Sequence, residues 1–162
     1  MTALFNQFSY LFLGLGLLAG FIILLRWRRV QWRGTLLAGA LLIAVVGGGW
    51  LVVRPGVSDV DTVQAAEEII HNGKPTFLEF FSNYCLGCVS ARPTVDALVT
   101  DIQDDFNILR IDIHTEQGRA LREKLGFSYS PEFILFDTNG QEVWRGNRPP
   151  TADQLALAAP LS

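Results

Sequence analysis

Two long apolar runs open the chain, and shorter apolar segments alternating with polar ones follow them. The runs at residues 8–25 and 34–53 contain no charged residue. A helix rises ~1.5 Å per residue, so each run is about long enough to cross a hydrocarbon core of ~30 Å. The pattern therefore predicts a two-helix transmembrane hairpin over residues 1–53, with a connecting loop at residues 26–33 and the lipid bilayer as its partner.

The pattern changes after residue 53. Residues 54–58 predict a linker, and residues 59–162 alternate between helical and strand periodicity in the order α-β-α-β-α-β-β-α. The apolar run at residues 76–82 is typical of a buried central strand, and the step Asn139-Gly140 predicts a tight hairpin turn. Strands that alternate with helices and end in a hairpin indicate an α/β domain, in which a mixed sheet carries helices on both faces.

The charge distribution predicts the orientation of the hairpin and excludes one class of partner for the domain. The predicted loop holds the only charged residues before residue 54, namely Arg26, Arg28, Arg29 and Arg33. Arginines beside membrane spans mark the cytoplasmic side, so the domain is expected outside, in the periplasm, at the cell exterior or in an equivalent lumen. From residue 54 onward, 16 acidic residues face nine basic ones, for a formal charge of −7. That balance excludes nucleic acid as a partner, because phosphate binding needs a basic surface.

Cys85 and Cys88 are the two cysteines of the chain, and they lie where a predicted strand passes into a helix. Unpaired N–H groups at a helix start stabilise a thiolate, and the spacing places both sulfur atoms within disulfide reach. We therefore expect Cys85 to be the attacking nucleophile and Cys88 the resolving thiol. Copper binding by this pair with His114 is a weaker alternative, and two inert buried thiols are another. No metal is expected.

The motifs around this pair resemble those of the thioredoxin family over about residues 59–160. The segment "FLEFFSNYCLGC" is similar to the family's strand and active-site loop, with Tyr84 where tryptophan is common. The segment "GFSYSPEFILFDTNGQEVWRG" is similar to the family's cis-proline segment with its following hairpin. The resemblance implies a thioredoxin-like fold and a cis bond between Ser130 and Pro131. It implies that Tyr84, Ser130 and Pro131 bind the substrate chain.

Glu79 is the one charged residue in the apolar run before the cysteines. A carboxylate rarely occupies such a position unless it is paired or functional. The resemblance places it where the family has a buried acid that takes a proton from the second cysteine, and burial should raise its pKa. If it is unpaired, replacing it with glutamine should leave stability level or higher. Arg110 on the next predicted strand is the candidate for an ion-pair partner.

Together these features predict a membrane-tethered thiol–disulfide oxidoreductase, working as a reductase of exported proteins and fitting a role in cytochrome c maturation. Its substrates would be disulfide-bearing proteins, and the redox-active disulfide Cys85–Cys88 would serve in place of a bound cofactor. The hairpin has no cysteine, so a separate thiol-conducting membrane protein is expected to donate the electrons. A disulfide oxidase or isomerase with the same residues remains an alternative, and a copper-binding metallochaperone is a less favoured one.

Overall fold

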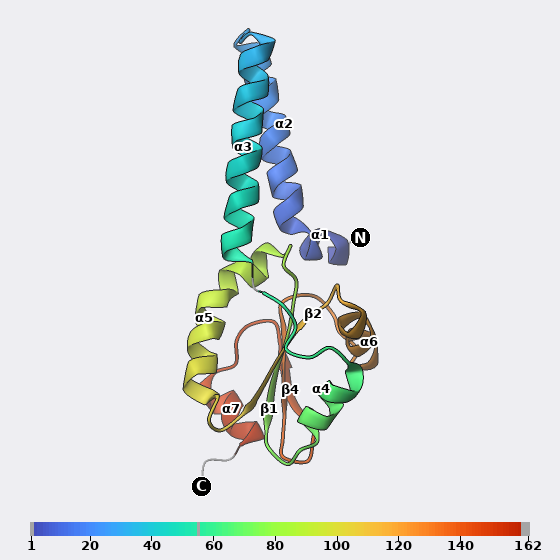
Figure 1. Ribbon diagram of the computed structural model, residues 1–162. Coiled ribbons are helices and arrows are strands. Elements are labelled where there is room, and N and C mark those ends of the chain that lie inside the picture. The colour runs from blue at the N-terminus through green and yellow to red at the C-terminus, as the bar shows by residue number, and fades with distance from the viewer. Residues whose placement is uncertain (1, 55, 160–162) are drawn as a thin grey trace.

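The computed structural model describes residues 2–54 and 56–159 and shows a long helical hairpin above an α/β domain (Figure 1). A short helix, α1 (Thr2–Gln7), leads into the two hairpin helices, α2 (Ser9–Trp27) and α3 (Trp32–Val53). Both hairpin helices are long and apolar enough to cross a membrane. Met1 of the predicted hairpin, Pro55 of the predicted linker and residues 160–162 of the predicted domain lie outside the described residues.

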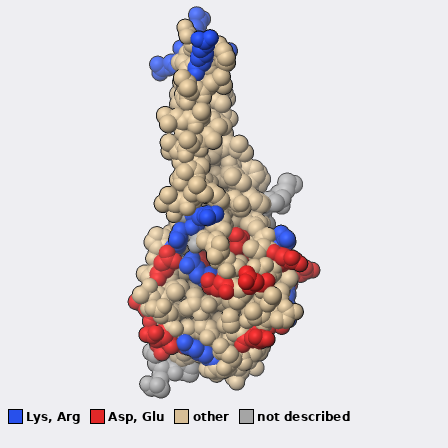
Figure 2. Space-filling view, viewed as in Figure 1, with Lys and Arg blue, Asp and Glu red and all other residues tan. Residues whose placement is uncertain are grey.

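The hairpin helices extend further than the apolar runs alone predicted. Helix α2 continues through Trp27 and α3 begins at Trp32, which leaves residues 28–31 as the connection. Tryptophan and arginine side chains are compatible with helix at a membrane interface, so polarity alone placed the helix ends too early. The basic side chains gather at the far tip of the hairpin, and the domain surface carries both signs of charge (Figure 2).

The domain follows the predicted order of helices and strands. Its strands are rich in phenylalanine, isoleucine and leucine, and threonine side chains cap two of its helices, with Thr62 accepting from the Ala65 N–H and Thr115 from the Gly118 N–H. The elements are α4 (Val63–Ile70), β1 (Thr76–Phe81), α5 (Leu86–Ile102), β2 (Asn107–Asp112), α6 (Glu116–Lys124), β3 (Glu132–Phe136), β4 (Glu142–Gly146) and α7 (Ala152–Ala158).

The four strands form one mixed sheet in the order β2-β1-β3-β4. Strand β1 runs parallel to β2 and antiparallel to β3, and β4 returns antiparallel to β3 after the turn at Gly140. Successive side chains of a strand point to opposite faces, so β1 contributes to two cores. One core contains Leu78 and Phe80 with residues of α4 and α6, and the other contains Phe77 with residues of α5. The predicted mixed sheet with helices on both faces is confirmed.

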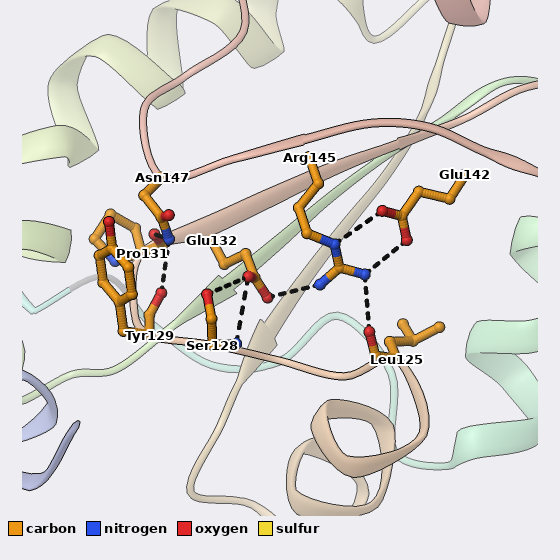
Figure 3. A network of polar contacts seen from close by, with 8 residues as sticks. All are labelled: Leu125, Ser128, Tyr129, Pro131, Glu132, Glu142, Arg145 and Asn147. Atoms are coloured by element: carbon orange, nitrogen blue, oxygen red, sulfur yellow. Dashed lines mark hydrogen bonds and ion pairs between the residues drawn. The ribbon is translucent and has the colours of Figure 1, made fainter.

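A buried carboxylate anchors the loop that precedes β3 (Figure 3). Glu132 is 1% exposed, accepts hydrogen bonds from the Ser128 N–H and hydroxyl, and pairs with Arg145 at 3.0 Å. Arg145 also donates to the Leu125 carbonyl at 2.8 Å. On the other side of the loop, the Asn147 amide donates to the carbonyls of Tyr129 and Pro131 at 2.9 and 2.8 Å. These contacts fix the segment that carries Ser130 and Pro131.

Removing the Arg145 side chain should destabilise the domain. In Arg145→Ala the buried Glu132 carboxylate loses its cation, and breaking a buried ion pair costs 3–5 kcal/mol. Because Arg145 is 26% exposed, we expect the free energy of unfolding to fall by about 2–4 kcal/mol, measured by denaturant titration. Arg148→Ala removes the same charge from an exposed position and is the control. Equal losses in the two variants would contradict a structural role for the pair.

Candidate active site

Both cysteines lie at the start of α5, directly after the loop that follows β1. Cys85 is the N-cap residue, and its sulfur accepts a hydrogen bond from the Cys88 N–H at 3.4 Å. The Cys88 sulfur accepts from the Ser82 N–H at 3.4 Å. Phe81, the last residue of β1, packs against both sulfur-bearing side chains. The central strand and the first turn of α5 together fix the positions of the two thiols.

The two thiols differ strongly in acidity. The pKa of Cys85 is lowered to about 6, chiefly because the Cys88 thiol donates a hydrogen bond to its sulfur, while burial works in the opposite direction. The pKa of Cys88 is raised, because it holds the shared proton and because it is buried. At neutral pH the arrangement therefore holds a thiolate at Cys85 and a protonated thiol at Cys88, which is the division of protons that a nucleophile and a resolving thiol require.

The cis-proline segment lies against the nucleophile. The Ser130–Pro131 peptide bond is cis, as the resemblance implied. The Cys85 sulfur lies 3.5 Å from the Ser130 carbonyl oxygen. A Cβ added at Gly87 would lie 3.3 Å from Pro131 Cδ and 3.6 Å from the Cys85 sulfur, so the helix start and this segment approach closely. Both Ser130 and Pro131 are thus beside Cys85.

Tyr84 faces the hairpin. Its ring stacks on that of Trp50 in α3, with centroids 5.6 Å apart and planes 6° from parallel, and also on that of Phe8 at 5.8 Å. The Trp50 indole N–H donates to the Asn83 carbonyl at 2.8 Å. The residue expected to contact substrate is therefore held by the helical hairpin in this conformation.

Glu79 is buried and paired. It is 1% exposed, and Arg110 Nε donates to its carboxylate at 2.7 Å. Arg110 also reaches Asp96 on α5 at 2.9 Å. The pKa of Glu79 is raised, because burial disfavours its charge more than the Arg110 guanidinium favours it. Arg110 is therefore the partner of Glu79, as the sequence suggested, so the carboxylate is not the unpaired group for which level or higher stability was expected.

Glu79 lies on the same side of the sheet as the cysteines. It alternates along β1 with Leu78 and Phe80, which point to the opposite core, so it shares a face with Phe81. Phe81 in turn packs against Cys85 and Cys88. A buried carboxylate with a raised pKa thus occupies the face of β1 that also carries Phe81, on the side of the sheet where the thiols lie.

His114 contacts the active-site loop. Its Nε2 lies 2.9 Å from the Ser82 hydroxyl, and burial lowers its pKa. Among residues 2–54 and 56–159, no group of three or more histidine, cysteine and acidic side chains is arranged to hold a metal ion. Sequence reasoning gave Ser82 no role, and nothing in its local pattern distinguishes it from an ordinary loop serine.

Residues 6–9 also contact this site, and sequence reasoning missed them. The Asn6 side-chain oxygen accepts from the Ser130 N–H at 3.1 Å, and the Ser9 hydroxyl accepts from the Leu86 N–H at 2.8 Å. Each pair is separated by more than 70 positions in the chain, so local patterns carry no signal for such contacts.

Comparisons with known proteins agree with this geometry. The family profile described as Thioredoxin matches residues 58–158. The Thioredoxin-like protein HCF164, chloroplastic, of Arabidopsis thaliana is 28% identical over 90 residues, covering 54% of this chain and 34% of that protein. Protein disulfide-isomerase erp38 of Neurospora crassa is 26% identical over 103 residues, covering 60% of this chain and 27% of that protein. The match thus spans about a quarter to a third of the length of these two curated relatives.

Solved structures show the same architecture. The thioredoxin of Malassezia sympodialis superposes with a TM-score of 0.52 at 18% identity, covering 60% of this chain and 84% of its own. At that identity the likeness shows the fold alone. The profile match, by contrast, includes the cysteine pair, the cis-proline segment and all four strands. The chain belongs to the thioredoxin family.

Proposed function

We propose that this protein is a membrane-tethered thiol–disulfide oxidoreductase that reduces disulfides in exported proteins. The observation that carries the proposal is the placement of two cysteines of unequal acidity at the start of α5, with Cys85 beside the cis bond between Ser130 and Pro131. Cys85 has a pKa of about 6 and Cys88 keeps its proton, with the two residues three positions apart. Two inert structural thiols would have no need of such a difference. A role in cytochrome c maturation is the finer part of the proposal and rests on the resemblance in overall build.

The reaction is a pair of thiol–disulfide exchanges. The Cys85 thiolate attacks one sulfur of the substrate disulfide, forming a mixed disulfide and releasing the other substrate sulfur as a thiolate, which takes up a proton from water. Cys88 then loses its proton and attacks the Cys85 sulfur, which forms the Cys85–Cys88 disulfide and releases the second substrate thiol. Two electrons pass from the dithiol to the substrate.

Glu79 is the proposed acceptor of the Cys88 proton, through an intervening water. Its raised pKa makes it a stronger base than an ordinary carboxylate. Its place on the face of β1 shared with Phe81 supports this role. The ion pair with Arg110 fixes the orientation of the carboxylate. It does not fully offset the effect of burial on the pKa, which stays raised.

The orientation of the anchor supports an extracytoplasmic domain. The arginines form the tip of the hairpin farthest from the domain (Figure 2). Under the positive-inside rule that tip lies in the cytoplasm and the domain on the opposite side of the membrane. There the oxidised form must be reduced again, and the hairpin carries no cysteine that could relay electrons. A separate membrane protein that conducts thiol electrons is therefore the proposed donor.

Trapping tests the proposed function. In Cys88→Ser the second step is blocked, so we expect exported proteins to remain disulfide-linked to Cys85 and to be recovered from membranes under non-reducing conditions. Cys85→Ser is the control, because it removes the nucleophile and should trap nothing. Recovery of the same proteins from both variants would contradict the mechanism, and recovery of cytoplasmic proteins alone would reverse the proposed orientation.

The acidity of Cys85 is testable by its alkylation rate. The reactive thiolate fraction should rise through pH 6 and level off above it, because the pKa of Cys85 is about 6. Cys88→Ala removes the donated hydrogen bond and should move the midpoint upward, toward an ordinary thiol at roughly 8.5. Cys88→Ser retains a donor and should stay nearer the original midpoint. Identical midpoints in the alanine and serine variants would show that the hydrogen bond is not the cause.

Glu79→Gln should slow the second exchange and also weaken the fold. Loss of a general base lowers turnover by roughly 10²–10⁴-fold, with the first attack by Cys85 less affected. Arg110 loses its buried partner, so the free energy of unfolding should fall by about 1–3 kcal/mol. Rapid-mixing kinetics and a denaturant titration measure the two effects.

Asp96→Asn is the matched control for this variant. It removes the other carboxylate on the same guanidinium, at a position that is 47% exposed. An exposed partner contributes at most about 1 kcal/mol, so stability should change little and turnover should be retained. If both variants slow the two exchanges to the same extent, Glu79 acts through Arg110 and the structure rather than on the proton.

A further inference from the structure

The nucleophile of the proposed reaction is closed off in this conformation. Cys85 has an exposed fraction of 0%. A substrate disulfide must bring one sulfur into direct contact with the Cys85 sulfur before exchange can occur. The segment that borders the site from outside the domain is residues 6–9, which comprise the end of α1, Phe8 and the start of α2, where the hairpin meets the domain (Figure 1). We call these four residues the N-terminal lid.

The lid occupies the hydrogen-bonding position expected for substrate. If a substrate chain adds as a short strand beside the cis-proline, the Ser130 N–H would donate a hydrogen bond to a main-chain carbonyl of that substrate. Here that N–H donates to the side-chain oxygen of Asn6 at 3.1 Å, and the Ser130 hydroxyl donates to the same oxygen at 3.2 Å. An asparagine side-chain carbonyl is chemically an amide carbonyl, like that of a peptide main chain. Asn6 therefore stands in for a substrate residue.

The lid also binds the loop on the other side of Cys85. The Leu86 N–H, one of the unpaired donors of the first turn of α5, donates to the Ser9 hydroxyl at 2.8 Å. The Ser82 hydroxyl donates to the main-chain carbonyl of Gln7 at 3.0 Å. The Phe8 ring packs on Tyr84, and its centroid is 4.9 Å from that of His114. The contacts flank Cys85 on both sides, so the lid spans the approach to its sulfur.

We propose that the N-terminal lid is an autoinhibitory segment that mimics a substrate chain and must leave the site before a protein disulfide can reach Cys85. This rests on the proposed function for the site it closes. The lid is held by a few hydrogen bonds, each of which shifts the closing equilibrium by only roughly two- to tenfold. Such a segment stays closed at rest and yields to a substrate that offers the same hydrogen bonds with additional contacts. It would protect a reactive thiolate from adventitious oxidation.

The test compares access to Cys85 in the full chain, purified in detergent and reduced. The probe is a maleimide attached to polyethylene glycol, used about two pH units above the Cys85 midpoint so that thiolate fraction is not limiting. The variant Asn6→Ala/Ser9→Ala removes three of the hydrogen bonds of the lid. We expect it to be labelled at Cys85 at least about tenfold faster than the unmodified chain.

Gln7→Ala is the matched control, because Gln7 contacts Ser82 through its main-chain carbonyl, which the substitution retains. It should be labelled at the original rate. Equal labelling rates in the double variant and the unmodified chain would contradict the proposal that these residues close the site. A thermal melt of each variant keeps a folding defect from being mistaken for lid opening.

Disulfide reduction is measured separately so that the two proposals fail independently. If the double variant is labelled faster and also reduces insulin disulfides faster, the lid regulates the proposed activity. If labelling is faster but no variant reduces any disulfide, the lid is supported and the proposed function is contradicted. If labelling rates are equal, the lid is excluded whatever the activity.

Discussion

Strand β1 is paired along both edges and covered on both faces, and the position of the active site depends on this arrangement. It pairs with β2 along one edge and with β3 along the other, and its two faces enter separate cores. A strand so confined has one register and one direction, because a shift of one residue would exchange its two faces. Because Phe81 is the last residue of this strand, the following loop and the first turn of α5 have a fixed position, with Cys85 beside Ser130.

Two buried polar pairs use this rigid frame in different ways. The sulfur atoms of Cys85 and Cys88 share a proton unequally, which lowers the pKa of one thiol and raises that of the other. Glu79 on β1 lies opposite Arg110 on β2. Burial raises the pKa of Glu79 more than the Arg110 guanidinium lowers it. In both cases a group is kept in a state that water would not favour. Such states persist only where the surrounding packing prevents relaxation.

The anchor is more than a tether in this arrangement. Trp50 of α3 holds the active-site loop through Asn83 and Tyr84, and residues 6–9 hold it through Ser82 and Leu86. The active site therefore lies where the hairpin enters the domain, close to the expected membrane surface. Under the proposed function, a substrate or electron donor would approach at that surface, and access to Cys85 would be coupled to the conformation of the hairpin.

Local patterns in the sequence determined most of the fold and the identity of the reactive pair. Uncharged runs, alternation in the strands and the spacing of Cys85 and Cys88 depend on neighbouring residues, so they can be read in order along the chain. The sequence could suggest Arg110 as partner of Glu79 but could not decide it, because that pairing depends on the register of β1 against β2. Only the tertiary structure decided the burial of Cys85, the stacking of Tyr84 and the contact of Asn6 with Ser130. Each of these joins residues far apart in the chain, and their meeting follows from how the helices and sheet pack together.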